Sequence, residues 1–242
     1  LGSDAVRRAI AEESRSKKVS HEKAKETAQG YITEIAADYR EGLIRFGDRL
    51  LTRIWNKIYN GISVGHADRI RELAANGHEI IYVPCHRSHV DYILLSYLVH
   101  ENGFVPPHIA AGINLNLPVV GALLRRGGAF FLRRSFRAHK LYAAVFYEYL
   151  STIQTQGVSI EYFIEGTRSR TGRLLQPRGG MLAMSVRSYL NAPVRPIMFQ
   201  PVYIGYERLA ARPGRARELV MLESSGFGES GPLSKYVTWG PN

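Results

Sequence analysis

Residues 78–100, HEIIYVPCHRSHVDYILLSYLVH, decide how this chain folds. The first part, 78–84, is mostly apolar and ends at a proline, which is typical of a short buried strand. The last part, 90–100, is an apolar run long enough for a helix. A cluster of polar residues lies between the two. A strand, a polar turn and a helix in this order predict a βαβ unit, the building block of a parallel sheet.

The same alternation continues along the chain. Strands are predicted at 107–113, 129–133, 158–165 and 195–206, and helices at 117–126, 138–154 and 180–190. Strands that alternate with helices of about ten residues or more indicate a parallel sheet. We therefore predict an α/β fold, with a mostly parallel central sheet flanked by helices and preceded by an N-terminal helical segment.

The N-terminal segment has the apolar periodicity of amphipathic helices. Apolar residues recur every three or four positions over 20–60, with Ser20 as the predicted N-cap. A short helix is predicted at 66–76. We predict three parts: a helical segment at 1–64, an α/β domain at 65–215, and a poorly patterned tail at 216–242. One further strand is predicted in the tail at 236–239.

Composition narrows the class of partner. The chain has 242 residues, a formal net charge of +11 and a single cysteine. The charge indicates polyanions, namely nucleic acid, anionic lipid or phosphorylated substrates, or else a basic solvated surface. One cysteine excludes an intramolecular disulfide and a multi-cysteine zinc site, and it suits a reducing compartment. Because the first residue is Leu, we expect a longer chain.

No run of about 18 apolar residues predicts a transmembrane helix. The nearest candidate, 109–124, is interrupted by two asparagines and a proline and is followed by Arg125 and Arg126. Such a segment is typical either of a membrane-surface element or of a buried strand and helix.

Polar residues follow three of the predicted strands. His86 and Asp91 follow the first, Arg133 and Arg134 follow the strand at 129–133, and Glu165 to Arg170 follow the strand at 158–165. Ligands of open parallel sheets bind beyond the carboxyl ends of the strands. We therefore expect these side chains to share one site.

The spacing of His86 and Asp91 is compatible with a hydrogen bond if His86 lies in the turn and Asp91 in the first helical turn. Ser88 is then the predicted N-cap. A carboxylate that accepts a bond from one imidazole nitrogen fixes the tautomer and leaves the other nitrogen to act as a base. The alternative is that Asp91 only caps the helix. Cys85 is predicted to pack inward.

The arginines predict the class of substrate. Guanidinium groups bind phosphate oxygens in a forked geometry, so a general base beside several arginines indicates a phosphorylated substrate with a hydroxyl group. Glu165 would order these arginines or bind a substrate hydroxyl. The alternative is a structural Glu–Arg network.

Four sequence blocks resemble the glycerolipid acyltransferase family: H-x4-D at His86 to Asp91, a strand that ends in Arg133 and Arg134, FIEGTRSR at 163–170, and an apolar strand that contains Pro201. Residues 15–24, 82–92 and 105–116 are also similar to the bacterial glycerol-3-phosphate 1-O-acyltransferases of the PlsB type.

The resemblance implies an α/β enzyme that moves an acyl group from acyl-CoA or acyl carrier protein to glycerol 3-phosphate, in phospholipid synthesis. It implies His86 as base, Asp91 as its partner, and substrate contacts from a further set: Arg133, Arg134, Glu165, Gly166, Arg168, Ser169, Arg170 and Pro201. No metal or cofactor is expected, because a thioester is already activated.

The same resemblance implies a peripheral or monotopic protein at the cytoplasmic face of the bacterial inner membrane, bound to an anionic lipid surface. No nucleic acid is expected as a partner. Two alternatives stay open from the residues: an acyl-thioester or phosphate-ester hydrolase that uses the same His86 and Asp91, and a non-catalytic basic module that binds lipid or nucleic acid.

Overall fold

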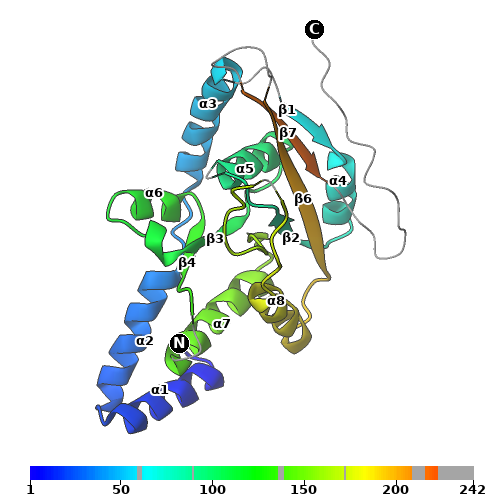
Figure 1. Ribbon diagram of the computed structural model, residues 1–242. Coiled ribbons are helices and arrows are strands. Elements are labelled where there is room, and N and C mark those ends of the chain that lie inside the picture. Colours follow the sequence, from blue (N-terminus) through cyan, green and yellow to red (C-terminus); the bar gives the residue numbers. More distant parts are fainter. Residues whose placement is uncertain (59–61, 89, 136–138, 172, 209–215, 223–242) are drawn as a thin grey trace.

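The computed structural model describes residues 1–58, 62–88, 90–135, 139–171, 173–208 and 216–222, and these form a seven-stranded sheet with helices on both faces (Figure 1). The strand order is β1-β7-β6-β2-β5-β3-β4. Every neighbouring pair is parallel except β6 and β7. The predicted fold, a mostly parallel sheet flanked by helices with helices at the N-terminus, is confirmed.

The strands are β1 Ile62–Gly65, β2 Glu79–Pro84, β3 His108–Gly112, β4 Ala129–Leu132, β5 Ile160–Glu161, β6 Ile197–Arg208 and β7 Ala216–Leu222. The α-helices are α1 Asp4–Lys17, α2 His21–Ile35, α3 Glu41–Ile58, α4 Ala67–Ala75, α5 Asp91–Glu101, α6 Val120–Arg126, α7 Lys140–Thr155 and α8 Gly180–Asn191, and a 3-10 helix η1 spans Ile113–Leu115. No helix in the described ranges has the length and apolarity that a membrane crossing requires.

Two strands were not expected from the sequence. β1 and β7 pair in parallel with each other, and β7 also pairs antiparallel with β6. The strand predicted at 236–239 lies outside the described residues. β5 has two residues instead of the eight predicted, because the chain leaves the sheet after Glu161 and turns towards the end of β2.

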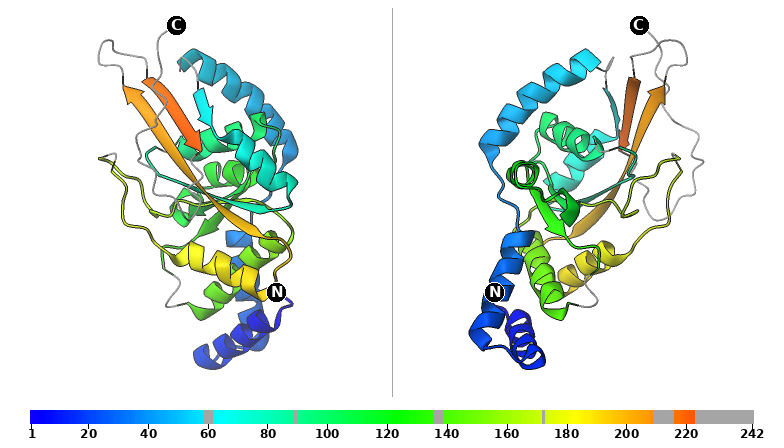
Figure 2. Two further views of the ribbon diagram at one scale, coloured as in Figure 1. Left: turned by 90° about the vertical axis from the view of Figure 1, so that its right-hand side faces the viewer. Right: turned by 60° about the vertical axis from the view of Figure 1, so that its left-hand side comes forward.

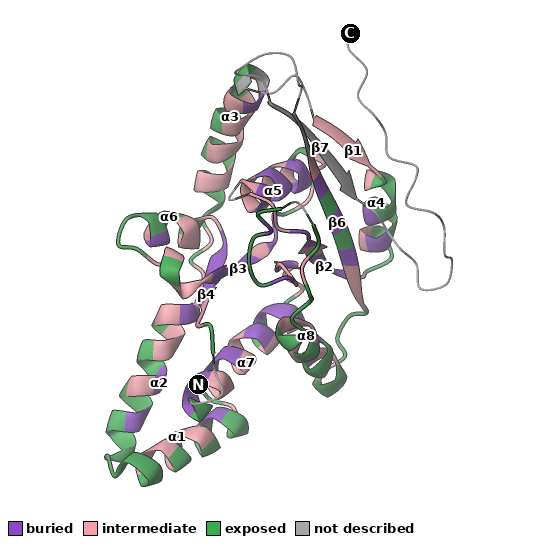
Figure 3. Cartoon of the chain, in the orientation of Figure 1, coloured by how far each residue is buried: buried purple, intermediate pink, exposed green. Residues whose placement is uncertain are grey.

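Each face of the sheet has its own hydrophobic core. On one face, α1, α2 and α7 pack over residues such as Ile81, Phe130 and Ile160. On the other face, α3, α4 and α5 pack over Tyr82 and Val202, among others. Figure 2 shows the hairpin of α1 and α2 at one end of the molecule, beside α7, and Figure 3 shows the buried stripes of α5 and α7. Helix layers on both faces leave the ends of the strands as the place for a site.

Ser20 caps α2, as predicted. Its side-chain oxygen accepts a hydrogen bond from Lys23 N at 3.2 Å. This bond satisfies one of the backbone N–H groups that have no partner within the first turn of a helix. The cap separates α2 from α1 and fixes where the hairpin turns.

Candidate active site

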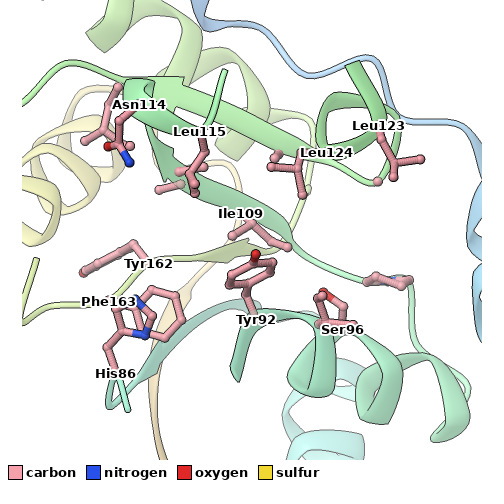
Figure 4. Close-up of a pocket in the computed structure, with 18 of the residues that line it drawn as sticks. His86, Tyr92, Ser96, Ile109, Asn114, Leu115, Leu123, Leu124, Tyr162 and Phe163 are labelled. Atoms are coloured by element: carbon pink, nitrogen blue, oxygen red, sulfur yellow. The ribbon is translucent and has the colours of Figure 1, made fainter. Parts of the chain in front are cut away.

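The ends of β2, β4 and β5 lie at the same edge of the sheet, and the residues that follow them border one cavity of about 1170 Å³. His86 follows β2, Arg133 and Arg134 follow β4, and Gly166 to Arg168 follow β5. Figure 4 shows His86 at one end of this cavity and the leucines of α6 across from it. The loops after β2, β4 and β5, which we expected to share one site, thus border the same cavity.

His86 and Asp91 are in direct contact. His86 Nδ1 lies 3.1 Å from Asp91 Oδ2, and the Asp91 side chain is fully buried. The same oxygen accepts hydrogen bonds from Arg87 N at 2.6 Å and Ser88 N at 2.8 Å. A carboxylate held by backbone donors orients the imidazole and stabilises its charged form.

The prediction that Ser88 is the N-cap of α5 is wrong. α5 begins at Asp91, and its N-cap, Val90, makes no side-chain cap bond. Ser88 Oγ instead accepts a bond from Val90 N at 3.2 Å. The carboxylate of Asp91 satisfies the backbone N–H groups of the preceding turn, so Asp91 both closes this turn and contacts His86.

Glu165 holds His86 by its backbone. The side chain is 2% exposed, and its two oxygens accept bonds from His86 N at 3.0 Å and Leu175 N at 2.8 Å. Ser169 N donates to His86 O at 2.9 Å. Both peptide groups of His86 are therefore fixed by the loop after β5. Glu165 ties three loop segments together.

Phe163 is a site residue that the sequence prediction missed. Its ring stacks on the imidazole of His86, with centroids 3.9 Å apart and planes 24° apart (Figure 4). The stack restricts rotation of the imidazole. A signal was present, because Phe163 opens the FIEGTRSR block that also supplies Glu165 and Arg168.

Three arginines border the cavity and are exposed: Arg134, Arg168 and Arg178. Arg178 was not predicted, because it lies at the far end of the β5–α8 loop and not directly after a strand. Its stem lies over Gly166, where an added Cβ would come within 2.8 Å of Arg178 Cδ. Gly166 has φ 67°, a conformation that side chains other than glycine rarely adopt. Gly166 thus leaves room for Arg178.

Arg133 forms an ion pair with Glu34, unlike the three exposed arginines. Its guanidinium donates to both carboxylate oxygens of Glu34, at 2.7 Å and 2.6 Å, and lies against the rings of Tyr31 and Tyr142. The hydrogen bond with Glu34 raises the pKa of Arg133 above its usual value. Arg133 borders the cavity, but its fork joins α2 to the end of β4.

Two other expected contacts lie away from the cavity. Pro201 is exposed on β6 opposite Val83, and Arg170 is exposed in the loop after β5. Neither is among the described residues that border the cavity. Ser169 is buried and reaches His86 through its backbone.

Cys85 packs inward, as predicted. The thiol is buried, and its sulfur accepts a hydrogen bond from Ile204 N at 3.2 Å. Burial raises the pKa of the thiol, which disfavours the nucleophilic thiolate. The side chain next to His86 is therefore part of the core.

The rest of the cavity is apolar. Its walls come from α3, α5, β3 and α6, with Leu50, Tyr92, Ile109 and Leu124 as examples. The lining thus combines a histidine and three exposed arginines with a large apolar part, and the apolar part suits a hydrocarbon chain. An amphiphile with an anionic head fits this division.

Comparisons with known proteins agree with this chemistry. The sequence profile of the Acyltransferase family matches residues 62–204, more than half of the chain. Three curated relatives, all called glycerol-3-phosphate acyltransferase, come from Alteromonas mediterranea, Pseudomonas syringae pv. tomato and Pseudoalteromonas atlantica. They are 72%, 60% and 58% identical over 86%, 84% and 90% of this chain, respectively, and the matches cover 26%, 24% and 27% of the relatives.

The chain thus spans about a quarter of the length of these relatives. A solved structure, the 1-acyl-sn-glycerophosphate acyltransferase PlsC from Thermotoga maritima, superposes with a TM-score of 0.47 at 20% identity, over 73% of this chain and 66% of that one. That likeness is too distant to bear on the site.

Proposed function

The chain belongs to the acyltransferase family, and we propose that it transfers a fatty acyl group from acyl-CoA or acyl carrier protein to the sn-1 hydroxyl of glycerol 3-phosphate. The product would be lysophosphatidic acid, at the first step of phospholipid synthesis. The relatives called glycerol-3-phosphate acyltransferase support this acceptor. The observation that carries the proposal is the His86–Asp91 pair beside an apolar cavity that three exposed arginines also border.

His86 is the proposed general base. It takes the proton of the acceptor hydroxyl while the oxygen attacks the thioester carbonyl carbon. The tetrahedral intermediate then collapses, the C–S bond breaks, and the leaving thiolate receives the proton from His86. Asp91 stabilises the imidazolium between these two steps, Phe163 holds the ring by stacking, and Glu165 holds the His86 backbone.

Arg134, Arg168 and Arg178 are the proposed phosphate ligands. Arg134 comes from the loop after β4, and Arg168 and Arg178 come from the loop between β5 and α8. All three are exposed at the cavity, and guanidinium groups suit phosphate oxygens. Arg133 and Glu165 are proposed to act by holding the loops rather than by touching substrate, because their charged groups already have protein partners.

The proposal is tested by product analysis with His86→Ala. The wild type should make lysophosphatidate from glycerol 3-phosphate, with less product from dihydroxyacetone phosphate or lysophosphatidate as acceptor. His86→Ala should lower kcat by about 10²–10⁴-fold. The control is His139→Ala, an exposed histidine before α7. Thioester hydrolysis that is equally fast without an acceptor would contradict acyl transfer.

We also propose that the protein works at an anionic membrane surface, at the cytoplasmic face of the bacterial inner membrane. Three residues form what we call the cavity mouth: Phe46, Leu50 and Leu123, which are 64%, 46% and 54% exposed and border the cavity. Exposed arginines, such as Arg49 and Arg53, lie on α3 together with Phe46 and Leu50. Apolar side chains beside basic ones favour anionic lipid.

A further inference from the structure

Glu161 lies in the middle of the sheet, and its side chain faces α5. The register pairs Ile81 with Ile160 and Tyr82 with Glu161. Ile81 and Ile160 belong to the core under α7, whereas Tyr82 belongs to the core under α5. Residues paired across parallel strands point to the same face, so Glu161 points with Tyr82 towards α5, the helix that begins at Asp91.

The carboxyl group of Glu161 has no compensating contact. The residue is fully buried, and neither side-chain oxygen has a hydrogen-bond partner among the described residues. A buried carboxylate without donors is strongly unfavourable, so the neutral acid is the favoured form. Asp91 differs, because its Oδ2 faces three donors.

The residues around Glu161 also favour its neutral form. Tyr82 is its partner in β2 and the apolar Ile109 its partner in β3, and Asp91 and Tyr92 begin α5, the helix on this face. Burial, and then the negative charge of Asp91, raise the pKa of Glu161 well above the usual range. Burial raises the pKa of Tyr92 too, with a contribution from Glu161.

We propose that Asp91 and Glu161 form a coupled carboxyl pair that carries one negative charge, on Asp91, and that the neutral state of Glu161 leaves the His86–Asp91 pair without a second negative charge beside it. A second negative charge behind Asp91 would stabilise the imidazolium of His86 and so deplete the neutral form that accepts a proton. The consequence for catalysis rests on the proposed function, whereas the shared charge is a property of the fold.

The first test observes the carboxyl groups directly, by NMR of the protein labelled with ¹³C at the glutamate side-chain carboxyl. At pH 7 the wild type should show a protonated glutamate signal that disappears in Glu161→Gln. Asp91→Asn should lower the titration midpoint of this signal by about one unit or more. The control is Glu79→Gln, which removes another buried glutamate, at the start of β2. An ionised Glu161 at pH 7, or one that Asp91→Asn does not affect, would overturn the proposal.

The second test uses Glu161→Gln, which keeps the size of the side chain and cannot ionise. The acid limb of the pH profile of kcat/KM and the His86 imidazole titration should both stay within about 0.3 unit of wild type. A shift to lower pH of about one unit or more would show that wild-type Glu161 carries charge, and would refute the pair. The NMR readouts need no turnover, so inactive protein with the expected signals would count against the proposed function alone.

Discussion

Asp91 owes its properties to its position in the chain. Its carboxylate lies where the backbone N–H groups of Arg87 and Ser88 converge, and this turn also presents His86. The residue is fully buried, so these bonds are not shared with water. One side chain therefore closes the turn, begins α5 and orients the imidazole.

Replacing Asp91 by Asn should remove this orientation with little change in shape. The amide can present an N–H where the carboxylate presented only acceptors, so it favours the wrong imidazole tautomer and repels a backbone donor. We expect kcat to fall by about 10²–10⁴-fold, with KM for glycerol 3-phosphate changed less than about threefold. Steady-state kinetics would check this. The control is Asp68→Asn, an exposed residue paired with Arg71 on α4, and an equal loss in that variant would contradict the role of Asp91.

Gly166 gives a second prediction at this scale. Gly166→Ala places a Cβ at φ 67° and within 2.8 Å of Arg178 Cδ. We expect a cost of about 1–2 kcal/mol in the free energy of unfolding and a rise in KM for glycerol 3-phosphate as Arg178 moves. Gly179→Ala is the control, because nothing lies within 4 Å of its added Cβ. Urea unfolding and kinetics of both variants would measure the difference, and equal effects would refute it.

The helices and strands at the site were largely predictable, because alternating apolar segments fix a parallel sheet, and strand ends then gather at one edge. Contacts between elements were less predictable. Arg133 follows β4 as directly as Arg134 does, yet its fork faces Glu34 on α2, a partner 99 residues away. Arg178 reaches the cavity from the far end of the β5–α8 loop, just before α8. Local patterns carry no information on such long-range contacts.

Neighbouring arginines should therefore respond differently to substitution. Arg133→Ala breaks the link from β4 to α2 and should destabilise the protein by about 1–3 kcal/mol. Arg134→Ala should leave stability unchanged and raise KM for glycerol 3-phosphate by about 10–100-fold, because a charge-assisted phosphate contact is lost. Thermal unfolding and kinetics of the pair would separate the roles. The assignment fails if Arg134→Ala destabilises as much as Arg133→Ala.

At the scale of the whole molecule, the carboxyl ends and the amino ends of the parallel strands differ in chemistry. The cavity lies at the carboxyl ends of the strands. At the amino ends, Glu79 is buried at the start of β2, where it is 3% exposed. The edge strand β1 and its neighbour β7 were not predicted, because they pair with each other although they are far apart in sequence. Pairing between distant segments is a property of the assembled sheet, which periodicity within one segment does not report.

Glu79 should make stability depend on pH. Burial raises its pKa to about 7, against 4.5 for an unperturbed glutamate. Because the folded state binds this proton more tightly, its contribution is fully present below pH 4.5 and is lost as the pH rises through about 7. Glu79→Gln removes this loss, so the variant should gain about 2–3 kcal/mol relative to wild type between pH 4.5 and pH 8. Urea unfolding at both pH values would measure this, with the exposed Glu22→Gln as control. A difference that does not change with pH would contradict it.

The cavity mouth gives the last prediction. If Phe46 and Leu123 enter a lipid surface, replacing both by Ser should weaken binding to anionic vesicles by about tenfold or more, since each buried apolar side chain contributes about 1–2 kcal/mol. Vesicle sedimentation at low salt would measure this, and added salt should weaken wild-type binding by screening the basic residues. Leu190 and Val194, which are 71% and 61% exposed and do not border the cavity, give the matched double variant. Equal losses in the two double variants would show that the cavity mouth is not the membrane contact.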